Sequence, residues 1–92
     1  MSNEIENTVQ ICNKKGLHAR AAAKFVNLVE GHTAKVEVAK DGARVCGSSI
    51  MGLLMLGASI GKTITIYASG DGAEEILTTL SNLVKEGFGE TE

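Results

Sequence analysis

The segment Gly16-Leu17-His18-Ala19-Arg20 brings together residue types that could carry out phosphoryl chemistry. His18 stands where a loop meets an apolar-striped helix, and the unpaired backbone N–H groups of a first helical turn favour an anionic group on the imidazole. The partial positive charge of that helix end also disfavours imidazolium, which leaves a neutral, nucleophilic ring. Arg20 adds a planar fork of N–H donors that fits phosphate oxygens. The segment therefore predicts a histidine that can carry a phosphoryl group.

A second segment forms a short helix that is apolar on every side. Ser48 or Ser49 can cap a helix over residues 50–56, which Gly57 would end. A helix on a sheet buries one face, so we assign only Leu53 and Leu56 to the core. The other apolar side chains predict an exposed patch that suits several protein partners, namely Ile50, Met51, Leu54 and Met55. The alternative is a helix that is buried all round.

The elements that must position these segments follow from apolar periodicity. Alternation predicts strands over residues 8–13, 34–40, 43–47 and 63–69. Helical spacing predicts one helix between His18 and Gly31 and another from about Gly72 to Gly87. The Asp41-Gly42 pair predicts a hairpin turn between the second and third strands. Every strand has one apolar side, which favours one antiparallel sheet with helices on one face, although a ferredoxin-like βαββαβ arrangement is a possible alternative.

Composition narrows the classes of function. A chain of 92 residues predicts a single domain, residues 1–92, with a modest core and its binding sites on the surface. A net charge of −2, with one Tyr, two Phe and no Trp, provides neither a basic stripe nor a stacking platform for nucleic acid. No apolar run approaches the roughly 20 residues that span a bilayer. We expect a cytoplasmic protein without membrane insertion.

The cysteines and the second histidine are expected to have no chemical function. Cys12 and Cys46 lie in separate strand-like segments without a Cys-x-x-Cys pattern, so we expect reduced thiols buried as small hydrophobic groups. No ligand cluster surrounds His18 or His32, and we expect no metal and no cofactor. His32 lies in a connection and is expected to have no functional role.

Two segments in order carry a family resemblance. Gly16-Leu17-His18-Ala19-Arg20, followed by Ser49-Ile50-Met51-Gly52-Leu53-Leu54-Met55-Leu56-Gly57, resembles HPr, the histidine-containing phosphocarrier protein of the bacterial phosphoenolpyruvate-dependent phosphotransferase system. The likeness covers nearly the whole chain, and its ending, Gly87-Phe88-Gly89-Glu90, looks like the nitrogen-branch paralogue NPr. The resemblance implies an α+β fold, an open-faced β-sandwich whose four-stranded antiparallel sheet is covered on one face by three helices.

The resemblance also implies a function. Nδ1 of His18 would accept a phosphoryl group from enzyme I and pass it to an EIIA-type component, for sugar uptake, regulation or both, as a carrier rather than a stand-alone enzyme. Backbone N–H groups of Ala19, Arg20 and Ala21, with the Arg20 guanidinium, would hold the phosphoryl oxygens. Ala21 departs from the proline usual in the family, which puts the rigidity of the site in doubt rather than its chemistry.

Further expectations come from the same resemblance. The exposed patch would dock enzyme I and the EIIA-type domains. Ser49 aligns with the serine that HPr kinase/phosphorylase modifies, and a plain helix cap is an equally weighted interpretation. A carrier that presents one site to successive proteins is expected to be a monomer. Two alternatives stay open, namely a regulatory phosphoprotein of the NPr type and a ferredoxin-like domain that binds a small molecule and has a structural His18.

Overall fold

A computed structural model describes residues 4–90 of the chain; residues 1–3 and 91–92 of the predicted domain lie outside the described part. Eight elements follow one another within residues 4–90. They are β1 (Ile5–Gln10), α1 (Ala19–Glu30), β2 (Lys35–Lys40), β3 (Ala43–Cys46), α2 (Ile50–Met55), β4 (Thr63–Ser69), α3 (Ala73–Lys85) and the 3-10 turn η1 (Gly87–Gly89). The order strand, helix, strand, strand, short helix, strand, helix is the predicted one.

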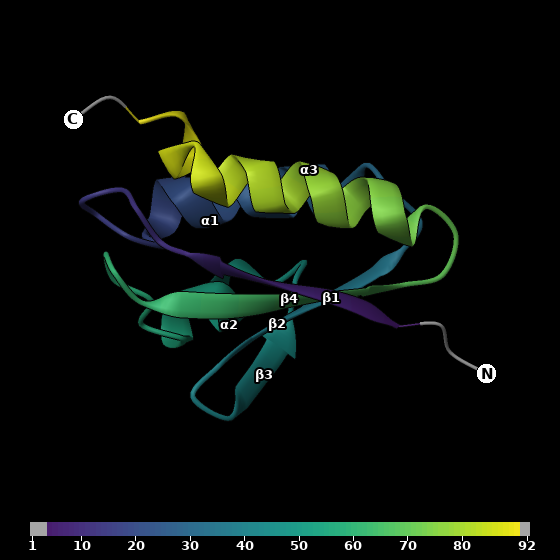
Figure 1. Ribbon diagram of the computed structural model, residues 1–92, viewed down its shortest axis with the longest axis horizontal. Helices are drawn as coiled ribbons and strands as arrows, with labels where there is room; N and C mark the ends of the chain where they lie inside the picture. The colour runs from purple at the N-terminus through teal and green to yellow at the C-terminus, as the bar shows by residue number, and fades with distance from the viewer. Residues whose placement is uncertain (1–3, 91–92) are drawn as a thin grey trace.

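The four strands form one antiparallel sheet in the order β1-β4-β2-β3. Figure 1 shows α1 and α3 side by side over one face of this sheet. The short helix α2 contacts α1 and β3, and Val45 of β3 packs against the same core. The predicted open-faced arrangement is thereby confirmed. The ferredoxin-like alternative is wrong, because β1 lies at an edge of the sheet and a third helix follows β4.

Alternation along the strands separates a buried face from an open one. On β4, Ile64, Ile66 and Ala68 are buried under the helices, and Thr65 and Tyr67 point to the opposite, open face. The helices present matching apolar stripes, and that of α1 is centred on the fully buried Phe25. The core therefore lies between the sheet and its helices, where burial of apolar surface stabilises the fold.

The β2–β3 hairpin turns as the sequence predicts. Asp41 has a φ of 52° and Gly42 a φ of 85°, which are the two positive values that a two-residue hairpin turn of this twist requires. β4 spans the predicted residues, Thr63–Ser69. Gly87, with a φ of 65°, follows the end of α3 as expected.

The first strand differs from its predicted range of residues 8–13. β1 begins at Ile5, three residues before the predicted start. The sequence did not reveal this start because the inward-facing Asn7 is polar and interrupts the apolar alternation. In the fold, Asn7 Nδ2 donates a hydrogen bond to Ser81 Oγ on α3 (2.9 Å). The regular ladder stops at Gln10. Pairing still reaches Ile11, whose N–H donates to the Lys62 carbonyl oxygen at 2.8 Å.

The expectation of buried cysteines is wrong. Both Cys12 and Cys46 are exposed, free thiols. Cys12 lies just past the end of β1, where its thiol donates toward the Val84 carbonyl (3.5 Å) at the end of α3. Cys46 pairs with Glu37 and so lies on the open face of the sheet. The alternation along β3 already places Cys46 on the same face as Arg44 and opposite Val45, so the error came from judging the thiol by residue type alone.

Candidate functional site

His18 is the N-terminal cap of α1. Its backbone is extended (φ −88°, ψ −176°), and its Nδ1 accepts a hydrogen bond from the Arg20 N–H at 3.3 Å. The first backbone bond of the helix runs from the Ala22 N–H to the His18 carbonyl (2.8 Å). The lone pair of Nδ1 therefore faces the first turn, where backbone donors have no partner within the helix.

The other ring nitrogen of His18 contacts the C-terminal segment. Nε2 lies against the Glu90 carboxylate, and the two side chains are 25% and 11% exposed. An ionised carboxylate only accepts hydrogen bonds, so the proton of the neutral ring is on Nε2. Hydrogen bonds from His18 and then Asn13 hold the pKa of Glu90 below its usual range.

Asn13 connects the carboxylate to the loop before the histidine. Its Nδ2 donates to the Gly16 carbonyl at 2.9 Å and to Glu90 Oε1 at 3.0 Å, and the residue is only 5% exposed. Both carboxylate oxygens of Glu90 are thus engaged, one by the imidazole and one by the amide. The loop, the ring and the C-terminal segment form one hydrogen-bonded network.

The C-terminal segment, residues 87–90, is fixed at two further points. Phe88 is fully buried with a φ of 56°, and its carbonyl accepts a hydrogen bond from Lys24 Nζ of α1 at 2.6 Å. Glu90 is a site residue that the sequence did not predict, because the segment Gly87-Phe88-Gly89-Glu90 was used only as a point of resemblance to NPr. The two glycines that flank Phe88 were the available signal, because glycine is typical of tight turns.

The predicted phosphate-binding residues occupy the first turn of α1. Ala19 and Arg20 are exposed and Ala21 is fully buried. Within residues 4–90, the Arg20 guanidinium has no ion-pair partner. The first turn therefore combines backbone donors next to Nδ1 with an exposed, positively charged Arg20 side chain, which is the chemistry that a phosphoryl group requires.

The short helix α2 combines a cap and an apolar surface. Ser49 Oγ accepts from the Gly52 N–H at 3.0 Å, so Ser49 and not Ser48 is the cap. Met51 and Met55 are 68% and 80% exposed, and Ile50 is 40% exposed. Three members of the predicted patch are therefore on the surface. The alternative of a wholly buried helix is wrong.

The three leucines of this segment differ in burial. Leu53 and Leu56 are buried, as expected. Leu54 is only half-buried and packs against the core, so it lies at the border of the predicted patch.

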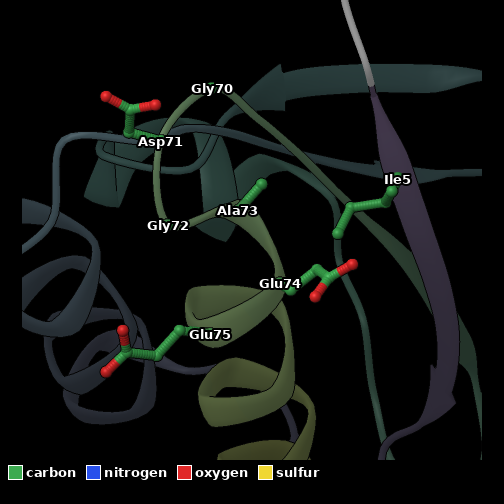
Figure 2. A pocket seen from close by; sticks show the side chains of 7 residues that line it. All are labelled: Ile5, Gly70, Asp71, Gly72, Ala73, Glu74 and Glu75. Atoms are coloured by element: carbon green, nitrogen blue, oxygen red, sulfur yellow. The ribbon is translucent and has the colours of Figure 1, made fainter.

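A separate hollow lies away from His18. Figure 2 shows it at the start of α3, an open depression of about 510 Å³ next to Gly70, Gly72 and Ala73, at the opposite end of α3 from Glu90. The charged side chains that line it are carboxylates, those of Asp71, Glu74 and Glu75. Such a lining repels phosphate, so this hollow is separate from the chemistry at His18.

Residues 4–90 contain no group of three His, Cys, Asp or Glu side chains that could hold a metal ion. Over the same residues, each helix is too short or too polar to cross a bilayer.

Comparison with known proteins gives consistent matches. The family model described as "PTS HPr component phosphorylation site" matches residues 5–86. The phosphocarrier protein HPr of Cupriavidus necator is 39% identical over 88 residues, which cover 96% of this chain and 99% of that protein. The phosphocarrier protein NPr of Shewanella violacea is also 39% identical, over 87 residues that cover 95% and 96% of the two chains. A crystal structure of HPr from Thermoanaerobacter tengcongensis superposes with a TM-score of 0.91 at 41% identity, covering 96% of this chain and 99% of the other.

The fold and the site define a class, small α+β proteins that present a helix-capping histidine beside an arginine and an apolar surface helix. The chain belongs to the HPr family of phosphocarrier proteins of the phosphotransferase system.

Proposed function

We propose that Nδ1 of His18 accepts a phosphoryl group from a phosphorylated histidine of enzyme I and transfers it to an EIIA-type protein. The observation that carries this proposal is the orientation of the ring. Nδ1 points at the first turn of α1 and Nε2 is occupied by Glu90. Only Nδ1 has a lone pair that an incoming phosphorus atom can reach beside backbone donors.

Bond formation at Nδ1 would release the Arg20 N–H that now donates to the ring. We expect that N–H, with those of Ala19 and Ala21 in the first turn of α1, to donate to the phosphoryl oxygens, and the Arg20 guanidinium to add positive charge. The product is a phosphoramidate, whose imidazole leaves readily, so the group can be passed on. Catalysis here is positioning and electrostatic stabilisation.

The test is phosphorylation in a reconstituted system. Incubation with phosphoenolpyruvate and enzyme I should give one acid-labile phosphate on the native protein and none on His18→Ala. Phosphorus NMR of the product should identify the Nδ1 isomer. A phosphate on Nε2 or on another residue, or no phosphate at all, contradicts the proposal.

The exposed part of α2 is the proposed docking surface for enzyme I and EIIA-type domains. It comprises Ile50, Met51 and Met55, with Leu54 at its border. Flexible, exposed methionines suit a surface that binds successive partners. Because α2 contacts α1, a protein seated there lies close to the helix that His18 caps.

A regulatory role for Ser49 is a second proposal, with HPr kinase/phosphorylase as the partner. Phosphate on its hydroxyl would add roughly −1.5 to −2 charges next to the apolar docking surface and weaken the approach of enzyme I. Phosphoryl acceptance by Ser49→Asp is the test, with Ser48→Asp as the matched control. Equal acceptance by both variants would leave Ser49 as a helix cap only.

Whether the protein serves the sugar branch or the nitrogen branch of the phosphotransferase system depends on which EIIA protein accepts its phosphoryl group. HPr of sugar transport is the first candidate, and the Gly87-Phe88-Gly89-Glu90 ending favours the NPr type as the second. Competition between a sugar-branch and a nitrogen-branch EIIA protein for the phosphorylated protein distinguishes them. We further propose that residues 1–92 act as one cytoplasmic, monomeric domain; light scattering of the purified protein tests the monomer.

A further inference from the structure

The Glu90 carboxylate is placed on His18 by several independent contacts. Oε2 lies against Nε2 of the imidazole, and Oε1 accepts from the nearly buried Asn13. The backbone on which Glu90 stands is held by the buried Phe88 ring and by the hydrogen bond from Lys24 to the Phe88 carbonyl. The fold therefore fixes the Glu90 carboxylate next to His18, although 72 positions in the sequence separate these two residues.

We propose that Glu90 is a positioning residue for phosphoryl transfer, which keeps the proton on Nε2 of His18 and stabilises the positive charge that the ring gains. This inference rests on the proposed function. It adds to that function a residue outside the histidine motif and assigns it a specific electrostatic task.

The bond changes show why a carboxylate is useful at this position. The Nδ1 lone pair forms the new N–P bond, and the bond from phosphorus to the donor histidine breaks with its electron pair going to the donor nitrogen. The proton on Nε2 stays where it is, so the phosphorylated ring carries a positive charge. A carboxylate hydrogen-bonded to that N–H stabilises the charge as it forms, in the way that a buried aspartate supports a catalytic histidine.

The same proton decides how well the group can leave. A ring that is protonated on Nε2 departs as neutral imidazole, whereas an unprotonated ring would depart as the anion. By retaining the proton, Glu90 keeps the phosphorylated protein competent to transfer. The effect operates in both directions, because acceptance and transfer pass through the same charged ring.

The local charges are compatible with this task. Nδ1 and Nε2 are at separate corners of the imidazole, so the phosphoryl group and the carboxylate do not share a nitrogen. The charged groups that face the carboxylate are the His18 ring and the Lys15 ammonium of the preceding loop. Lys24, from α1, is engaged by the Phe88 carbonyl.

The test compares Glu90→Gln, which keeps an oxygen acceptor without the charge, with Glu90→Ala and with a matched control, Glu86→Gln. Glu86 follows α3 and is exposed, and its substitution removes one carboxylate from the same end of the molecule. Two quantities are measured, the rate of phosphoryl acceptance from phosphorylated enzyme I and the nitrogen-15 spectrum of the phosphorylated ring at one pH slightly above neutral.

We expect both Glu90 variants to accept phosphate about 10- to 100-fold more slowly than the native protein, the range typical of residues that orient a reactive group. In both, Nε2 of the phosphorylated ring should show the signal of an unprotonated nitrogen, whereas the native protein and Glu86→Gln show a protonated one. Unchanged rates together with an unchanged spectrum in Glu90→Gln would overturn the inference. Failure of the proposed function itself looks different, because then the native protein carries no phosphate on His18.

Discussion

Gly16 lies directly against the backbone of Ala58. A Cβ at Gly16 would come within 2.5 Å of the Ala58 carbonyl oxygen, the same oxygen that accepts the Leu17 N–H at 2.9 Å. This approach attaches the loop that precedes His18 to the segment that follows α2. The loop that leads to the reactive ring therefore contacts the segment that follows the proposed docking surface.

Substitution of Gly16 should therefore be more damaging than substitution of a glycine that lacks this contact. Gly57 has almost the same φ, 62° against 64°, but a Cβ added there would meet no atom within 4 Å. Gly57→Ala should cost about 1 kcal/mol from its left-handed backbone alone. Gly16→Ala should lower the free energy of unfolding by clearly more, as measured by urea denaturation. Equal losses in the two variants would show that the Ala58 contact is unimportant.

Arg20→Ala should slow phosphoryl acceptance without affecting the fold. Charge-assisted hydrogen bonds are worth about 1.5–3 kcal/mol, which corresponds to about 10- to 100-fold in rate. The side chain is exposed, so the free energy of unfolding should stay constant. Rapid-quench measurement of transfer from enzyme I checks the rate, and Arg44→Ala, on the open face of the sheet, is the control. A native rate in Arg20→Ala removes the guanidinium from the mechanism.

Met51→Glu should weaken the binding of enzyme I while preserving stability. Met51 is 68% exposed, and a charge placed within an apolar interface must be desolvated on binding. We expect a loss of affinity of about tenfold or more, the effect of a typical hot spot. Thr78→Glu adds the same charge on the exposed side of α3 and should bind normally in calorimetric titration. Equal affinities for the two variants would place the docking surface elsewhere.

Ser49→Ala should destabilise the protein by about 1 kcal/mol through loss of the α2 cap. Ser48→Ala should have a smaller effect, because Ser48 is exposed and its hydroxyl contacts the Cys46 thiol (3.0 Å) rather than a helical N–H. Thermal unfolding of the two variants under identical conditions distinguishes them. The reverse order of stabilities would contradict the assigned cap.

The stability contributed by Glu90 should depend on pH. Its pKa is lower in the folded protein, so its contribution is fully present above the unfolded value, about 4.3, and is lost as pH falls through the folded value. The difference in unfolding free energy between the native protein and Glu90→Gln should therefore be largest above about pH 5 and shrink below about pH 4. Urea denaturation of both proteins at several pH values measures this difference. A difference that stays constant in acid would contradict the hydrogen bond to His18.

Much of the fold was predictable because its signals are local. β4 appears in the sequence as a regular alternation of Ile64, Ile66 and Ala68, and the hairpin as the Asp41-Gly42 pair. The His18 cap could be located because a helix start has a local pattern of its own. In each case a few adjacent residues determine the backbone, so no knowledge of distant contacts was needed.

The features that were missed depend on contacts between distant segments. Glu90 is a polar residue after the last helix, and only folding of the Phe88 turn brings it to His18. Asn7 concealed the start of β1 because its partner is on α3. Neither of these relationships has a periodicity that can be read along the chain.

The ladders of the sheet also have a consequence for folding. Two residues connect β2 to β3, whereas Ile5 of β1 pairs with Ala68 of β4. The entropy lost on closing a loop grows with its length, so we expect the hairpin to form early and the first strand to dock late. A single loop joins that late strand to His18. A refolding chain should thus gain its capacity to carry phosphate in the final, slow kinetic phase, along with native β1–β4 pairing.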